Sequence, residues 1–289
     1  MRWKRSRVPL GIAVLVTVIA PVMWGSSSST EHLDAGAIIR KSVTANLADW
    51  QAQPKYSYRE WYVRTKLKAD EKPKVEENKT FEVLMVEGTP YERLVKLNNE
   101  PLSVQEEQQE QRKLNKEVQA RQKESSKERH SRISKYQEER SEEHLLMQQM
   151  VDAFLFKLLG EEEVDGVSCY VLDASPKPNY HAPVEKARVL TGMQGKLWIA
   201  KDGFHWAKIQ AHVMRSVPFG LFIAQVKPGT AFELRQAAVG GVWLPRYFSQ
   251  SVNATVLGFY GMRSKEEEHY SDYHLNVLNA DARHASTRR

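Results

Sequence analysis

Cysteine is almost absent from this 289-residue chain, which contains only Cys169. A single cysteine cannot form an internal disulfide, so the small disulfide-stapled scaffolds of secreted proteins are excluded. Cys169 lies in the apolar run VSCYVL, where a free cysteine commonly packs as a small hydrophobic residue. We therefore expect it to be buried and not to act as a nucleophile.

Long apolar runs are scarce as well, and the most prominent one, from Val8 to Trp24, is interrupted by Pro9 and Pro21. Four basic residues precede this run and a serine run follows it, which is the layout of a secretory signal. The run is also short for a membrane span of about 20 residues. No cysteine follows it, so a lipid anchor on an N-terminal cysteine is excluded. We expect residues 1–30 to be a signal peptide or a retained N-terminal anchor, and the protein to be exported to the periplasm.

A strong charge of one sign is lacking once the N-terminus is set aside. Lys and Arg number 42 against 36 Asp and Glu, a net charge of +6, but without the four basic residues before the apolar run the balance is 38 against 36. The remaining basic clusters are interleaved with Glu, whereas a nucleic-acid-binding protein needs a basic face. We expect no nucleic-acid partner.

Motifs for the common catalytic sites are missing: the chain has no nucleophile elbow, P-loop, dinucleotide glycine pattern or H-E-x-x-H motif. The nearest approach to a metal site is the group Glu268, His269, Asp272 and His274. On a strand, Glu268, Asp272 and His274 would share one face while His269 points to the other. A polar strand face is the default interpretation of the group, so we expect a non-enzymatic protein without metal or cofactor. A metal-dependent hydrolase remains a third hypothesis.

The first half of the chain mixes helix and strand signals. Asp34 can cap a helix that runs to about Trp50, with Ile39, Val43 and Leu47 on one face. The pattern then predicts a strand over residues 56–65, a loop over 66–78 and a hairpin that turns at residues 87–90.

A helical insert is expected over residues 102–160. Residues 103–143 are dominated by Gln, Glu, Lys and Arg, which favours a solvated helix or helical hairpin. The end of the insert is different, because its apolar residues recur at helical spacing before Gly160 closes the helix. These residues are Met147, Met150, Val151, Phe154, Leu155 and Leu158.

From Val164 onward the pattern is that of an antiparallel meander. The segment GKLWIAKDGFHWAKI contains two strands joined at Asp202-Gly203, and strands of similar length follow as far as His269–Leu275. Some of these strands alternate apolar with polar residues, while FGLFIAQV is apolar on both faces and needs cover on each side. We expect a disordered tail over residues 279–289.

Three phrases in this order of elements resemble the outer-membrane lipoprotein-sorting family, the LolA/LolB-like proteins: DGVSCYVLDASPKP, MQGKLWIAKDGFHWAKI and GGVWLPRYF. The resemblance covers Asp34 to Leu275 and implies an α+β, mainly β domain over residues 31–278. Its fold would be a single antiparallel curved sheet, an open half-barrel with helices on the concave side. The charged insert is longer than this family pattern requires. The resemblance also implies an apolar cavity that holds acyl chains.

Aromatic residues of the expected strands and of the insert helix either pack a single core or line such a cavity. The cavity hypothesis assigns ligand binding to Met150, Phe154, Trp198, Trp206, Phe219, Phe222, Phe232 and Trp243. We thus expect a monomer that binds a lipid, a lipoprotein acyl chain or another apolar ligand. The alternative is an envelope structural or sensory module that contacts a protein partner through residues 103–143.

Overall fold

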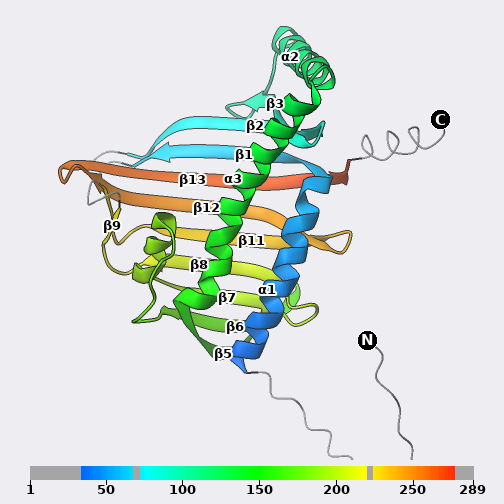
Figure 1. Ribbon diagram of the computed structural model, residues 1–289. Helices are drawn as coiled ribbons and strands as arrows, with labels where there is room; N and C mark the ends of the chain where they lie inside the picture. Colours follow the sequence, from blue (N-terminus) through cyan, green and yellow to red (C-terminus); the bar gives the residue numbers. More distant parts are fainter. Residues whose placement is uncertain (1–33, 68–71, 220–223, 277–289) are drawn as a thin grey trace, which may run out of the picture. The chain divides into compact units, whose positions relative to one another are not determined.

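The computed structural model describes residues 34–67, 72–219 and 224–276, so the expectations for residues 1–30 and for the tail from residue 279 fall outside it. Among the described residues, thirteen strands form one antiparallel sheet, accompanied by three α-helices, of which α3 is the longest, and two short 3-10 helices (Figure 1). No helix in this part of the chain has the length and apolarity needed to cross a membrane. The elements in chain order are α1 (Ala35–Ala52), the 3-10 helix η1 (Gln53–Lys55), β1 (Tyr56–Lys66), β2 (Lys74–Val86), β3 (Thr89–Leu97), β4 (Glu100–Pro101), α2 (Val104–Gln122), α3 (Ser126–Ala153), β5 (Phe154–Val164), β6 (Val167–Pro176), the 3-10 helix η2 (Glu185–Gly192), β7 (Met193–Ala200), β8 (Trp206–Val213), β9 (Val217–Phe219), β10 (Ala224–Val226), β11 (Ala231–Val239), β12 (Val242–Val256) and β13 (Tyr260–Leu275).

The strand order is β4-β3-β2-β1-β13-β12-β11-β8-β7-β6-β5; off this path, β10 pairs with β12 and β9 pairs with β10. Most neighbours are consecutive strands. Two pairings along this order are not: β1 pairs with the last strand, β13, and β8 pairs with β11. The order begins at β4 and ends at β5, so the sheet is open. This confirms the predicted open antiparallel sheet with helices and a long charged helical insert.

Local sequence explains where most elements begin. The Asp34 carboxylate accepts a hydrogen bond from the Ala37 N–H at 2.6 Å and starts α1 as predicted. Ser103 and Ser125 each form a reciprocal capping box, with Glu106 and Glu128, at the starts of α2 and α3. The β2–β3 turn falls on Glu87-Gly88, as the turn composition predicted.

The expected helix end at Gly160 is wrong, because α3 ends at Ala153 and β5 begins at Phe154. Phe154 and Leu158 fit helical spacing, but together with Phe156 they also fit the two-residue period of a strand. Pairing of β5 with β6 satisfies the backbone along ten residue pairs and decides between the two. Two smaller corrections concern strand length: β2 begins inside the expected loop at Lys74, and β13 begins at Tyr260.

Side chains alternate between two faces of the sheet. One face carries the row Leu172–Leu197–Ile209–Leu234 across β6, β7, β8 and β11, and these residues belong to the main core with α1 and the end of α3. We call this the helix-facing face; in Figure 1 both α1 and α3 lie across the strands on this side. A smaller cluster on the opposite face contains Cys169, Val171, Trp198 and Ala207.

Candidate functional site

The helix-facing face is indented by a row of small residues. Ala174 on β6, Gly195 on β7 and Ala211 on β8 lie directly opposite one another, and Phe232 on β11 continues the row. Larger residues of the neighbouring row stand beside them, so the short side chains leave a depression. We call this depression the groove.

Met150, near the end of α3, and Phe154, the first residue of β5, close the groove at one end of the sheet. Both are buried, and both line a pocket whose other walls come from η2 and the sheet. The cavity volume is only about 20 Å³, roughly the space that one water molecule needs. The groove is therefore closed by the chain itself. We call Met150 and Phe154, the two residues that close it, the plug. The pocket is lined by Met150, Phe154, Ala174, Leu190, Met193, Gly195, Leu197, Ile209, Gln210, Ala211 and Phe232.

Three of the eight residues assigned to ligand binding meet at this pocket: Met150, Phe154 and Phe232. Trp206 belongs to the same core but does not line the pocket, and its indole N–H donates to the Ser42 hydroxyl at 3.1 Å.

The remaining assigned residues lie elsewhere. Trp198 and Trp243 belong to the cluster on the opposite face. Phe219 is half-buried at the end of β9, and Phe222 lies outside the described residues. Sequence periodicity marked all eight as apolar but could not tell which face of the sheet each would occupy.

Cys169 is buried in the cluster on the opposite face, as the sequence predicted. Burial, assisted by the nearby Glu162, raises the pKa of its thiol to about 11. A thiol held protonated and out of contact with solvent is a poor nucleophile.

A polar anchor that the sequence did not reveal holds α1 on the sheet. One carboxylate oxygen of the buried Asp49 lies 2.6 Å from His205 Nδ1, and the other accepts the Trp243 N–H at 2.9 Å. Ser42 and Asn46 are also buried on this side of α1, where the apolar stripe had pointed to Val43 and Leu47. The Ser42 hydroxyl donates to the Ile39 carbonyl and accepts from the Trp206 indole N–H, so both of its hydrogen bonds serve to hold the fold. The Asp49–His205 pair therefore positions α1.

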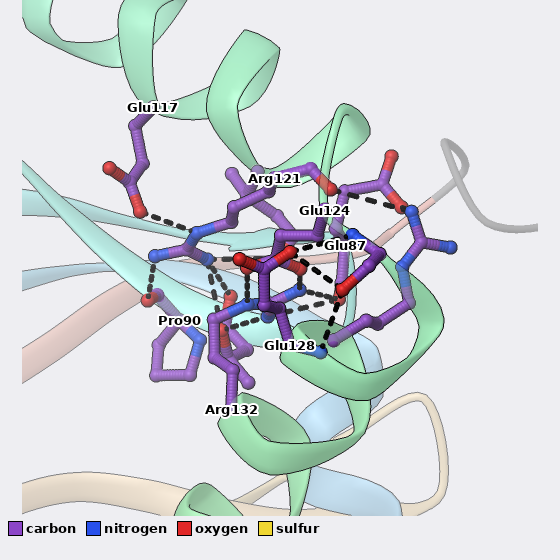
Figure 2. A network of polar contacts seen from close by, with 11 residues as sticks. Glu87, Pro90, Glu117, Arg121, Glu124, Glu128 and Arg132 are labelled. Carbon is purple, nitrogen blue, oxygen red and sulfur yellow. Dashed lines mark hydrogen bonds and ion pairs between the residues drawn. The ribbon is translucent and has the colours of Figure 1, made fainter.

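The charged insert is clamped onto the β2–β3 hairpin. The Arg121 guanidinium, which is buried, donates to the carbonyls of Val86 and Thr89 at 2.9 Å and to that of Pro90 at 3.3 Å. Figure 2 shows this guanidinium aimed at the turn, with Glu117 on its other side. The end of α2 is thus fixed to the β2–β3 turn at one end of the sheet.

Arg132 on α3 completes the clamp. It donates to the Glu87 carbonyl at 3.2 Å and to the Thr89 hydroxyl at 2.7 Å, while Glu124 pairs with it at 2.6 Å (Figure 2). The hydrogen bonds that Arg132 donates to Glu124 hold the pKa of the Arg132 guanidinium above its usual range and that of the Glu124 carboxyl below it. The hydrogen bonds of the clamp are strong ones, because the charged groups bond both the turn and each other.

α1 and α3 also contact each other directly. The Arg140 guanidinium lies 4.4 Å from the centre of the Trp50 ring and donates to the Trp50 carbonyl. The ring of His144, one turn further along α3, stacks on Trp50 at 4.3 Å. Burial lowers the pKa of His144, which favours the neutral ring in this stack.

A cluster of carboxyl and phenol groups lies on β1 and β13, on the face that α3 crosses. Burial, followed by the nearby Glu268 and Glu92, raises the pKa of Glu60 to about 7. Tyr270 donates to Glu268, and burial raises the pKa of Tyr270. The helix-facing face is therefore apolar under the end of α3 and acidic and aromatic under its middle.

The four residues considered as a metal site do not converge. His269 stacks on Trp61 at 4.7 Å, Asp272 pairs with Arg59 at 2.7 Å, and His274 contacts the Asp272 carbonyl. Asp272 has a positive φ, and an irregularity in the pairing of β1 with β13 breaks the strand alternation beside it. In the described part of the chain, no group of three His, Cys, Asp or Glu side chains is arranged to hold a metal ion.

Neither a protein-family model nor a curated protein matches the chain. Solved structures do match, among them a LolA superfamily protein from Nitrosomonas europaea at 12% identity, which aligns over 85% of this chain and 94% of its own with a TM-score of 0.27. A putative outer membrane lipoprotein-sorting protein domain from Vibrio parahaemolyticus matches at 11% identity, over 82% and 93%, with a TM-score of 0.31. The MucA/MucB complex from Pseudomonas aeruginosa matches at 9% identity, over 84% and 99%, with a TM-score of 0.25.

Two of the matched structures bear the name of the family that the sequence resembles. At this level of similarity they concern the fold alone. Ligand and partner are therefore argued from the residues of this chain.

Proposed function

We propose that the protein is a monomeric, non-enzymatic protein of the periplasm that binds an apolar ligand of the fatty-acyl class in the groove. The supporting observation is the plugged groove itself: a row of small residues across three strands, closed by one methionine and one phenylalanine at the end of a helix. The side chains around it are apolar except for Gln210, which suits a ligand that is held by burial and not by polar contacts.

Binding requires the plug to move, because the closed cavity is far smaller than an acyl chain. Burial of an acyl chain gains about 0.8 kcal/mol per methylene, so about ten buried methylenes contribute roughly 8 kcal/mol. Exposing Met150 and Phe154 costs about 1.5–3 kcal/mol each. The burial gained by the ligand therefore exceeds the burial lost by the plug, and the flexible Met150 and Met193 side chains can adapt to either occupant.

Filling the groove tests the proposal. Ala211→Leu adds three carbons to the floor of the groove and is expected to abolish uptake of a fluorescent fatty acid by delipidated protein. Ala207→Leu is the matched control, because Ala207 is equally apolar but belongs to the cluster on the opposite face. In both variants the added carbons overpack the fold, which we expect to lower the free energy of unfolding by about 1–3 kcal/mol. Equal uptake by the two variants, or wild-type protein that takes up no fatty acid, would rule the groove out as the binding site.

The alternative function, a protein-contact module, is favoured by one observation on α2. Arg121 is the one buried residue of this 19-residue helix, so most of the helix surface is accessible to a partner. Removal of residues 103–143 separates the two functions. If the shortened protein keeps fatty-acid uptake but loses capture of an envelope protein, the insert is the contact arm.

A further inference from the structure

The β12–β13 hairpin ends in an unusually exposed group of large apolar side chains, which we call the tip. Within six residues, Leu257 is 62% exposed, Phe259 81%, Tyr260 63% and Met262 42%. A three-residue loop connects Val256 to Tyr260, and Leu257 holds a φ of +53° in it, which a branched side chain adopts rarely. Apolar side chains that are concentrated and held in water commonly mark an interaction site.

Basic residues line the same end of the sheet behind the tip. Lys74 on β2 lies opposite Lys66 on β1, and Lys66 lies opposite Ser264, the neighbour of Arg263 on β13. On the other side, Arg263 pairs in register with Asn253, whose carbonyl accepts the backbone N–H of Lys227. We call Lys66, Lys74, Lys227 and Arg263 the basic row. Glu76 offsets part of its charge, since its carboxylate lies 4.0 Å from Lys66.

The spacing between tip and basic row fits the surface of a bilayer. Four residues separate Phe259 from Arg263, or about 13 Å at the rise of a strand. Side chains of interfacial segments enter a membrane by about 5–10 Å. With the tip inserted, the basic row would lie within about one Debye length of the lipid headgroups.

We propose that the tip inserts into a membrane surface that contains anionic lipid, with the basic row held by the headgroups. The positive charge of the basic row favours this occupant, because Lys and Arg side chains are attracted to an anionic leaflet. An apolar tip without these charges would fit any apolar surface. The proposal is independent of the groove, since none of the pocket-lining residues belongs to the tip.

A site-specific probe tests the insertion in the full-length chain. The native Cys169 is buried, so Phe259→Cys introduces a thiol that an environment-sensitive fluorophore labels selectively. Vesicles of phosphatidylglycerol and phosphatidylethanolamine are expected to shift the emission to the blue and shield the label from a soluble quencher. Val104→Cys is the control, because Val104 is 73% exposed at the start of α2, away from the tip. A label at 259 that responds no more than one at 104 overturns the proposal.

Flotation with the same vesicles measures the two contributions. Phe259→Ser is expected to weaken vesicle binding roughly tenfold to hundredfold. Arg263→Gln is expected to weaken it about fivefold and to reduce its salt dependence. Unchanged binding by Phe259→Ser, or a tip-dependent dimer seen by sedimentation without vesicles, would assign the tip to another role. Fatty-acid uptake by both variants should match that of wild type, which separates failure here from failure of the groove.

Discussion

At the scale of single residues, the Glu60 carboxyl is a partly buried acid whose pKa is raised well above its usual value. It lies on the helix-facing face among Glu92, Glu268 and the tyrosines of β1 and β13, and its pKa is raised to about 7. An acid with a raised folded-state pKa stabilises the fold most below its unfolded-state pKa, where it is protonated in both states. The contribution is lost as pH rises from about 4.3 through 7, because the folded state then retains a proton that the unfolded chain has released.

Glu60→Gln is accordingly expected to increase the free energy of unfolding at pH 8, by at most about 4 kcal/mol, since one pKa unit corresponds to 1.36 kcal/mol. At pH 4 the variant and the wild type should have nearly equal stability. Urea unfolding at the two pH values provides the measurement. A gain of the same size at both pH values would show that packing, and not ionisation, is responsible.

Asp49 has the opposite character, because its charge is satisfied by neighbours. Asp49→Ala leaves the His205 ring and the Trp243 N–H without their acceptor, so we expect a loss of roughly 2–4 kcal/mol in unfolding free energy. Asp152→Ala is the control, an exposed aspartate near the end of α3, expected to change stability by less than about 0.5 kcal/mol. Equal Tm values for the two variants would contradict an anchoring role for Asp49.

At the scale of elements, the sequence was informative wherever the signal was local. The Asp34 cap and the Glu87-Gly88 turn involve residues a few positions apart, and both were predicted. The end of α3 was not, because Phe154 and Leu158 satisfy the helical and the strand period together and only pairing with β6 decides. The Asp49–His205 contact joins residues 156 positions apart, which no periodicity reveals.

The Arg121 clamp is the element-scale feature with the clearest consequence. Arg121→Met keeps the length of the side chain but leaves carbonyls of the β2–β3 turn without their donor, at a cost of about 3–5 kcal/mol. We expect the loss to fall on the α2–α3 hairpin, seen as faster amide hydrogen exchange in α2 than in the wild type. Arg112→Met, at an exposed position on the same helix, should leave the exchange unchanged. Uniformly faster exchange throughout the sheet would mean that the clamp supports the whole fold.

At the scale of the whole molecule, the site depends on contacts between distant parts of the chain. The groove comes from β6, β7 and β8, its plug from the junction that precedes them, and the clamp on α3 from the β2–β3 turn. The sequence identified Met150, Phe154 and Phe232 as apolar candidates, and the sheet brought these three together. The sequence could not separate these three from Trp198 and Trp243. The face that a strand residue occupies depends on register and on bulges such as the one between Trp198 and Ile199.

The pairing of β1 with β13 makes the last strand a central one, which leads to a prediction about truncation. β13 is paired along ten positions with β1 and along ten with β12, so it joins the β1–β4 part of the sheet to the remainder. A chain that ends after Gly258 loses this strand and exposes both neighbours as edges, so we expect insoluble or unfolded protein. A chain that ends after Asn276 keeps every described contact, including the Ser57 hydrogen bond to the Asn276 side chain at 2.8 Å. Its Tm should equal that of the full-length protein in circular dichroism melts. Cooperative folding of the chain that ends after Gly258 would show that the two parts of the sheet fold independently. The position of α3 over the groove would then not depend on β13.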